Sequence, residues 1–345
     1  MAELTYYVDT DVSGGLGDGS SWANAYASLN ACLTAEATNL VGSGNNVVVL
    51  CRASNGTADT IQASTAGWGC SYNTGETLEI RCADTIGYSW NDTIYRMSNS
   101  NMTYSLRNTL SGVIVNGLQM EVAAINANYQ HCLDLFGFLS NNPIEVKNCL
   151  FKSANQSTYR ERLVYLELAG GRVVYMYNNV FYNMGDAAHF ASCPLTLSNQ
   201  GTVNMYRNVF DGGEYNVYYP VIGSGATLAY NNIFTGGNLG ISQNAIDWDG
   251  SSDYNSTDQS SGVDSGGNTR TSQTFTFVDE NNGNFYLDPT DTGAKGYGTD
   301  LSGATPSVTI DRLGETLESP FDIGAYQFLG GVIVPFNILR PLGSL

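Results

Sequence analysis

Two acidic side chains of this sequence are placed to do acid–base chemistry together. Asp186 follows Phe181 by five residues and Glu214 follows Phe210 by four, and the two phenylalanines end similar stretches of sequence. If these stretches stack on one another, both carboxyl groups lie in neighbouring loops. A pair about 5–5.5 Å apart would suit a retaining glycosidase, and a wider pair an inverting one. The alternative is that both acids are ordinary turn residues.

A polysaccharide lyase would need a strong base beside a uronate whose charge is neutralised by a cation. Arg207 is the candidate base because it replaces an asparagine of the neighbouring stretches. No group of three aspartates accompanies Arg207 in the alignment, so the lyase is the weaker of the two enzyme hypotheses.

Calcium is the one cofactor that the sequence suggests, because aspartates near the N-terminus offer the oxygen ligands it prefers. They are Asp9, Asp11 and Asp18, within a loop rich in glycine and serine. Their spacing is not that of an EF-hand. The alternative is that these aspartates end a strand and cap turns.

Aromatic side chains after the repeated stretches could stack on sugar rings, because an aromatic face suits the apolar face of a pyranose. The candidates are Tyr215, Tyr218, Tyr219 and Trp248. The alternative places them inside the protein or at a subunit contact.

The composition excludes several other classes of function. The chain has 345 residues, with 14 basic against 32 acidic side chains and a net charge of −18. Nucleic acids and anionic membranes select basic surfaces. The two histidines form no HExxH pattern, and no GxSxG or phosphate-loop motif occurs. No apolar run long enough to span a bilayer and no signal peptide is visible. We therefore expect neither nucleic acid nor a membrane as partner.

The seven cysteines form no CxxC motif and are interpreted mainly as small buried residues. A disulfide between Cys51 and either Cys82 or Cys70 is the alternative.

The framework for these candidate residues begins with a strand at 4–8, a loop of glycine and aspartate, and a helix at 22–40. Ser20 or Ser21 would cap the helix. Apolar residues then recur at helical spacing, at Tyr26, Leu29, Leu33, Ala37 and Leu40. The run VVVL at 47–50 predicts a buried strand.

Similar short stretches recur along the middle of the chain. They are VNGLQ (115–119), VKNCLF (146–151), MYNNVF (176–181), MYRNVF (205–210) and AYNNIF (229–234). Their last residues, Gln119, Phe151, Phe181, Phe210 and Phe234, are 32, 30, 29 and 24 residues apart. A period of this size indicates stacked units that cannot bury an apolar face alone.

We therefore predict an all-β fold, a single-stranded right-handed parallel β-helix with an N-terminal capping helix. Residues 1–45 would form the N-terminal strand, loop and helix, 46–329 the coils, and 330–345 a C-terminal segment. The phenylalanines should form an interior ladder. Asn179, Asn208 and Asn232 should occupy a left-handed turn and bond one another from coil to coil. The alternative is an antiparallel sandwich or a propeller, although a propeller blade needs about 40–50 residues.

Three stretches are similar to one known family. They are YYVDTDVSGGLGDGSSWANAYASLNACL (6–33), TFVDENNGNFYLDPTDTGAKGYGTD (276–300) and FDIGAYQF (321–328). They resemble the opening, a late coil and the closing strand of the pectate-lyase-like right-handed β-helix proteins of phages and bacterial surfaces. The resemblance implies the fold. It leaves the function open, because lyases, hydrolases, adhesins and phage spikes share this architecture.

The final segment, GGVIVPFNILRPLGSL at 330–345, is apolar and carries one charged side chain. Such a segment would favour aggregation in water, so we expect it to dock on another molecule; packing back on its own coils is the alternative. The expected anchoring residues are Val332, Ile333, Val334, Phe336, Ile338 and Leu339.

The leading hypothesis is a structural or adhesive protein on a virion surface, a phage decoration or spike component attached through its C-terminal segment, with a glycan as candidate ligand. Its partners would be a capsid or tail protein, or further copies of itself, for example in a trimer. The alternatives are an extracellular polysaccharide lyase or glycoside hydrolase, and a bacterial surface adhesin. The weak catalytic signals lean against an enzyme.

Overall fold

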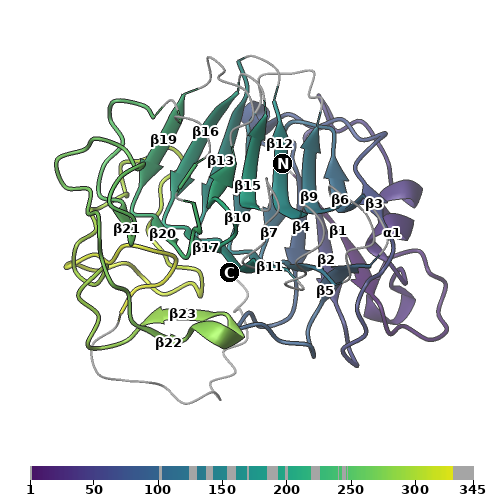
Figure 1. The fold of residues 1–345 in the computed structure, drawn as a ribbon. Coiled ribbons are helices and arrows are strands. Elements are labelled where there is room, and N and C mark those ends of the chain that lie inside the picture. The colour runs from purple at the N-terminus through teal and green to yellow at the C-terminus, as the bar shows by residue number, and fades with distance from the viewer. Residues whose placement is uncertain are drawn as a thin grey trace.

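The computed structural model of this chain is built mainly from parallel β-sheets (Figure 1). It describes residues 2–100, 103–123, 130–136, 143–153, 161–168, 171–184, 193–198, 201–218, 226–239, 241, 242, 246 and 248–328. Three sheets of eight, seven and six strands dominate it. The predicted all-β class is therefore confirmed, and the arrangement is compatible with a parallel β-helix.

The strands of each sheet are given in their order across that sheet. Sheet 1 contains β1 (Ala2–Asp9), β2 (Asn45–Arg52), β4 (Leu78–Cys82), β7 (Val113–Asn116), β10 (Ile144–Lys147), β13 (Val173–Tyr177), β16 (Thr202–Tyr206) and β19 (Thr227–Tyr230). Sheet 2 contains β5 (Arg96–Asn99), β8 (Gln119–Val122), β11 (Leu150–Ser153), β14 (Val180–Met184), β17 (Val209–Gly212), β20 (Ile233–Thr235) and β21 (Ser256–Thr257). Sheet 3 contains β3 (Ala63–Ser64), β6 (Tyr104–Asn108), β9 (Gln130–Phe136), β12 (Glu161–Glu167), β15 (Cys193–Ser198) and β18 (Val217–Tyr218).

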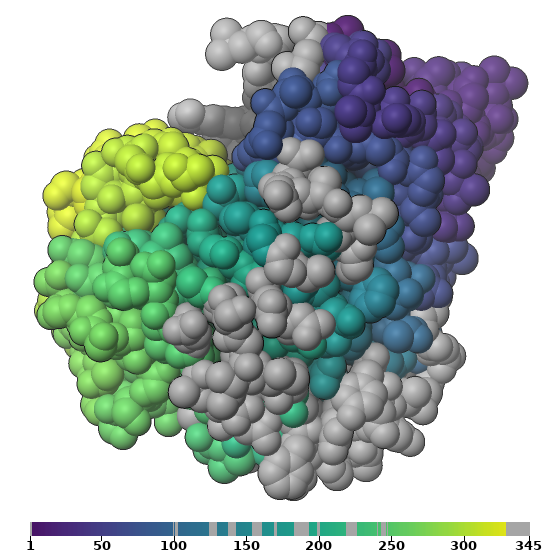
Figure 2. Space-filling model, turned by 90° about the horizontal axis from the view of Figure 1, so that it is seen from above, coloured from purple at the N-terminus to yellow at the C-terminus, as the bar shows by residue number. Residues whose placement is uncertain are grey.

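Successive strands along the chain visit the three sheets in turn. β7, β8 and β9 belong to sheets 1, 2 and 3, and the next three triplets, up to β18, repeat this order. Each triplet pairs in parallel with the triplets before and after it. Figure 2 shows the same order as bands of colour, from purple through teal to green, with the yellow C-terminal segment beside the green one. The repeated stretches therefore stack as predicted.

The predicted phenylalanine ladder lies in the interior. Adjacent ring centroids of Phe151, Phe181, Phe210 and Phe234 are 4.8, 4.8 and 5.2 Å apart, with interplanar angles below 10°. All four side chains are fully buried. The sequence pattern matches Gln119 of the first repeat with Phe151, which is wrong by one residue. In the structure Phe151 is in register with Met120, and Gln119 is in register with Leu150.

The predicted asparagine ladder runs beside the phenylalanines. The Asn179 side-chain amide donates to Asn208 Oδ1 at 3.0 Å, Asn208 to Asn232 Oδ1 at 3.0 Å, and Asn232 to Asn255 Oδ1 at 2.9 Å. The ladder ends where Asn255 donates to the Asp264 carboxylate at 2.7 Å. Each buried amide of the row forms hydrogen bonds with its neighbours. The row therefore stabilises the stack without leaving a buried polar group unsatisfied.

The left-handed residue of each turn is the one before the ladder asparagine, not the ladder asparagine itself. Asn148, Asn178 and Asn231 have φ near +57°, and Arg207 has φ +55°. The amide side chain tolerates this conformation. The predicted turn is therefore confirmed, but its left-handed residue lies one position earlier than predicted.

The N-terminal helix is present but much shorter than predicted. α1 spans Leu29–Ala35, and Ser28 Oγ caps it by accepting the Ala31 N–H at 3.2 Å. The preceding residue Tyr26 is instead extended, because its backbone pairs with that of Val8 in β1. This pairing outweighs the helical spacing of the apolar residues. Short 3-10 turns lie at Trp22–Asn24, Tyr72–Thr74 and Glu280–Asn282.

The C-terminal part differs from the expected late coil and closing strand. β22 (Phe277–Asp279) and β23 (Asn284–Leu287) form an antiparallel hairpin, and 321–328 contains no strand. Apolar residues of this part pack on the outer face of sheet 2, among them Phe285, Ile323 and Tyr326. Others, Leu301 and Val308, pack on Tyr177 and Tyr206 of sheet 1. The segment therefore covers parts of two sheets instead of extending the stack.

All seven cysteines are buried, as the main interpretation predicted, and no disulfide joins any two of them. Cys51 and Cys82 stand opposite each other on β2 and β4 without a disulfide. Within the described ranges, no helix is both long and apolar enough to cross a membrane.

Candidate functional site

The outer face of sheet 3 gathers aromatic and charged side chains in rows that cross its strands. Leu106, Leu133, Val164 and Leu195 are in register and belong to the interior core. Because successive side chains of a strand alternate between faces, the residue after each of these points outward. That outward row, the platform row, consists of Arg107, Asp134, Tyr165, Thr196 and Tyr218.

A second row lies three residues earlier on the same strands, at Tyr104, His131 and Arg162. On each strand the two residues between the rows are both buried. The rows therefore face the same way, and their side chains touch. His131 stacks on the Tyr165 ring at 4.8 Å between centroids, with an interplanar angle of 22°.

Each arginine of this face lies over aromatic rings. The Arg107 guanidinium is 4.1 Å from the Tyr104 ring centroid. The Arg162 guanidinium is 5.2 Å from the Tyr165 centroid and 5.7 Å from that of Tyr218. Cation–π attraction of this kind holds the planar groups in place. The rings and guanidinium groups are thus ordered before any ligand arrives.

Two acids complete the face. Arg107 donates to Asp134 Oδ2 from Nε at 2.8 Å and from Nη2 at 2.6 Å. Burial raises the pKa of Asp134, and the Arg107 partner opposes this rise. The Tyr165 hydroxyl donates to Glu167 at 3.1 Å. The described face therefore carries carboxylate acceptors as well as guanidinium donors.

His131 stays uncharged at neutral pH. Its side chain is buried, and burial, with the nearby Arg162 and Arg107 charges, lowers its pKa to about 3. A neutral imidazole can stack and form hydrogen bonds, but it adds no positive charge to the face.

The face is open to a ligand in part. The Arg107 side chain is 33% exposed and Phe136 is 40% exposed. Tyr104, Tyr165 and Tyr218 are half-buried. Sheets 1 and 2 are packed against the C-terminal segment, whereas the apolar clusters that this segment forms contain no residue of sheet 3. Asp134, His131 and Thr196 of this face are only 1%, 5% and 0% exposed, so a ligand would reach the rings and guanidinium groups around them.

The predicted glycan-binding residues are divided between this face and the interior. Tyr218 ends the platform row. Tyr215 lies close to Tyr218, and this proximity adds to the effect of burial in raising the pKa of Tyr215. Trp248 packs against the end of the interior ladder and is half-buried; its ring is edge-on to Phe234, 6.1 Å away, and its Nε1 donates to the Gly262 carbonyl. Tyr219 lies outside the described residues.

The predicted carboxylate pair is only partly described. Glu214 is 5% exposed. Its charge adds to the rise in the pKa of Cys193, so Glu214 lies near the start of β15. Asp186 lies outside the described residues, as do the six anchoring residues of the C-terminal segment, Val332, Ile333, Val334, Phe336, Ile338 and Leu339. Their roles stay predictions.

Arg207 is fully buried and fastens the C-terminal segment to the stack. Its Nη1 donates to the Asp322 carbonyl at 2.6 Å and its Nη2 to the Tyr326 carbonyl at 2.9 Å. Asn178 and Asn231, at the same position of their turns, donate to the carbonyls of Ile310 and Thr299. Burial lowers the pKa of Arg207 to about 10, so the guanidinium stays protonated at neutral pH. This geometry lends no support to Arg207 as a catalytic base.

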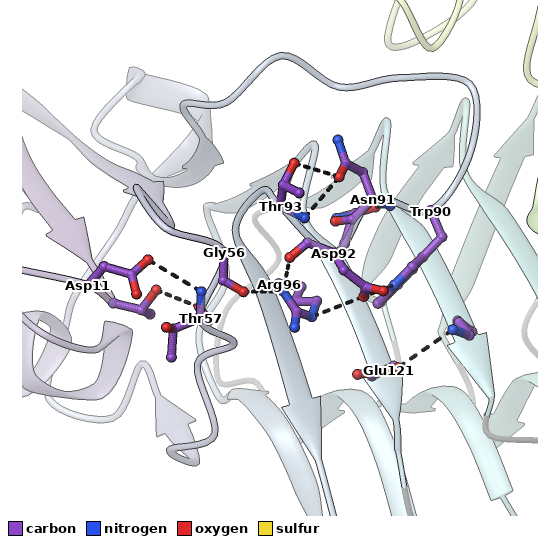
Figure 3. A network of polar contacts seen from close by, with 12 residues as sticks. Asp11, Gly56, Thr57, Trp90, Asn91, Asp92, Thr93, Arg96 and Glu121 are labelled. Carbon is purple, nitrogen blue, oxygen red and sulfur yellow. Dashed lines mark hydrogen bonds and ion pairs between the residues drawn. The ribbon is translucent and has the colours of Figure 1, made fainter.

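The predicted calcium ligands each have protein partners. Asp9 pairs with Arg52 at 2.8 Å, Asp11 accepts backbone N–H groups of residues 55 and 57 (Figure 3), and Asp18 accepts the Ser20 N–H and hydroxyl. In the part of the chain that the structure describes, no three His, Cys, Asp or Glu side chains are grouped to hold a metal ion. The calcium hypothesis therefore gains no support from this loop.

A second polar network lies on sheet 2 beside β5 (Figure 3). Arg96 bonds the Asp92 carbonyl at 2.5 Å and approaches its carboxylate at 3.4 Å, while Trp90 Nε1 donates to the same carboxylate at 2.8 Å. The Lys152 ammonium is 4.9 Å from the Trp90 centroid and 3.9 Å from Glu121. These contacts join the loop that carries Trp90 to β5, β8 and β11, so we interpret the network as structural.

Most of the platform face was missed by sequence reasoning, which followed the turn between sheets 1 and 2. A signal exists in YSLR (104–107), HCLD (131–134) and RLVY (162–165), each with two buried residues between outward ones. Only Tyr218 had been named there as a glycan contact.

No protein-family model, curated protein or solved structure gives a significant match to this chain. The functional argument therefore rests on the geometry of the site.

Proposed function

We propose that this chain is a glycan-binding structural protein of a virion surface, built as a single right-handed parallel β-helix of the pectate-lyase-like type. Its binding site is the outer face of sheet 3. The observation that carries the proposal is the platform row with the second row beside it, in which the Arg162 guanidinium lies over the rings of Tyr165 and Tyr218 from different strands.

Rings and fixed polar groups on a rigid scaffold suit carbohydrate recognition. A tyrosine offers an apolar face for a sugar ring and a hydroxyl for its polar edge. The stack places these rings on paired strands instead of loops, so little conformational entropy is lost on binding. The same pairing covers strand edges along the stack, which favours a protein that persists outside cells.

The test is glycan binding by the wild type and by Tyr165→Ala. Tyr165 contacts both His131 and the Arg162 guanidinium, so its loss removes the centre of the platform. We expect the wild type to bind a defined class of glycan on a printed array, and the variant to lose at least about tenfold in affinity. Tyr175→Ala, a half-buried tyrosine of sheet 1, is the matched control. Equal binding by Tyr165→Ala and the wild type would contradict the proposed site.

Attachment to the virion is proposed to run through 330–345, because this apolar stretch carries a single charge. Deleting it should leave the melting temperature of the purified protein nearly unchanged and should abolish its incorporation into particles. The measurement is immunoblotting of purified particles against the full chain. Incorporation at the wild-type level would remove the basis for this part of the proposal.

A further inference from the structure

We propose that the outer face of sheet 3 recognises a neutral, hydroxyl-rich, linear glycan and discriminates against acidic polysaccharides. This inference rests on the proposed glycan-binding function and specifies the chemical class of its ligand. Three independent features of the described residues support it: the charge balance of the face, the charge of the whole chain, and the extent of the platform row.

The charges of the described residues on this face cancel. Arg107 and Arg162 contribute two positive charges, and Asp134 and Glu167 contribute two negative ones. Arg107 makes both of its contacts to a single Asp134 oxygen, so its charge already has a partner. An anionic sugar would have to compete with Asp134 for this guanidinium and would also approach the Glu167 carboxylate. A hydroxyl group faces no such conflict.

The same groups fit hydroxyls in both hydrogen-bonding directions. A sugar hydroxyl donates one hydrogen bond and accepts others. Carboxylates only accept hydrogen bonds and guanidinium groups only donate them, so Glu167 can accept from sugar hydroxyls while Arg107 and Arg162 can donate to hydroxyl oxygens. Asp134 is 1% exposed and orients the Arg107 guanidinium. His131 adds no charge, because burial keeps its imidazole neutral.

The whole-chain charge acts in the same direction. The net charge of −18 gives a field that repels a polyanion, and this repulsion would have to be overcome for every acidic unit that approaches. A site selected for polyanions would be expected to carry an excess of Lys and Arg, which the described residues of this face lack. A neutral glycan pays no such electrostatic cost.

The length of the platform row indicates a chain and not a single sugar. Its five residues stand on five neighbouring strands, from β6 to β18. At about 4.8 Å per strand the row spans roughly 19 Å, which exceeds the size of one sugar ring. Tyr165 and Tyr218 would provide the stacking platform, and Arg107, oriented by the buried Asp134, would bind hydroxyls of a sugar farther along the chain.

The experiment compares neutral and acidic hexasaccharides by calorimetry with the full chain. The neutral probes are cello-, xylo-, malto-, manno- and N-acetylchito-hexasaccharides, and the acidic probes are hexasaccharides of galacturonate, alginate and hyaluronan. We expect a neutral probe to bind most tightly, and about tenfold more weakly to Tyr218→Ala, with Tyr175→Ala as the control. We also expect less than a twofold change in affinity between about 50 and about 500 mM NaCl.

The outcomes separate this inference from the proposed function. Tightest binding of an acidic probe, with an affinity that falls steeply with salt and depends on Arg107 or Arg162, would overturn the inference and leave the glycan-binding function standing. Absence of binding to every probe and to a broader glycan array would count against both. If Tyr218→Ala does not fold, the salt dependence of the wild type still decides between a neutral and an acidic ligand.

Discussion

Replacing Phe210 by alanine is expected to lower the free energy of unfolding by about 4 kcal/mol. Phe210 is fully buried and stacks between Phe181 and Phe234, with centroids 4.8 and 5.2 Å away. The truncation leaves a cavity in the middle of the ladder, and the two neighbouring rings lose their stacking contacts. Because strands on both sides fix the backbone, the site can collapse only in part. Urea unfolding followed by circular dichroism measures the loss.

Phe136→Ala is the matched control for this prediction. Its side chain is 40% exposed on the outer face of sheet 3, so its removal should cost less than about 1 kcal/mol. If Phe210→Ala were no more destabilising than Phe136→Ala, the phenylalanine ladder would not be a principal source of stability.

Replacing Asn208 by alanine is expected to cost about 3 kcal/mol. The Asn208 Oδ1 accepts from the backbone and side-chain amides of Asn179, and its Nδ2 donates to the Met176 carbonyl and to Asn232. Alanine would leave the Asn179 donors buried without their acceptor. The effect should therefore exceed that of one ordinary hydrogen bond, and hydrogen exchange should rise at the amides of residues 179 and 208.

Asn204→Ala provides the comparison on the adjacent strand, because Asn204 is a half-buried residue of β16. Its loss should change the unfolding free energy by less than about 1 kcal/mol. Equal effects of the two substitutions would mean that the ladder amides contribute no more than surface polar groups.

The repeated stretches predicted the stacking well because one physical requirement shapes each of them. The turn between sheets 1 and 2 needs a left-handed residue, then a buried amide, then an interior ring. All three requirements recur in the units that end at Phe181, Phe210 and Phe234, so similarity between these units is strong. In the first repeat Gly117 holds the left-handed position and Leu118 that of the amide, and this difference caused the alignment error of one residue.

The elements outside the repeats were harder to predict because long-range contacts decide them. Tyr26 has the spacing of a helical residue but pairs as an extended residue with Val8. The stretch 321–328 has the composition of a strand. Its backbone is nevertheless held by hydrogen bonds from Arg207 to the Asp322 carbonyl and from the Gly324 N–H to the Asn231 carbonyl. Neither contact can be recognised from the local sequence pattern.

The platform face was largely hidden in the sequence for a related reason. Arg107, Asp134 and Tyr165 are different residue types on successive strands, so they form no repeat. Their proximity follows from register, which becomes clear only when the strands are paired. Arg207 is the opposite case. Its departure from the repeat indicated a special role, and its contacts attach the C-terminal segment to the stack.

The most direct test of the glycan-binding account is a crystal structure of the full chain soaked with the tightest-binding neutral hexasaccharide. The account predicts sugar density along the platform row from β6 to β18, with a ring stacked on Tyr165 or Tyr218 and hydroxyls within hydrogen-bonding distance of Arg107. Density on another surface of the molecule, with the platform row uncovered, would contradict it.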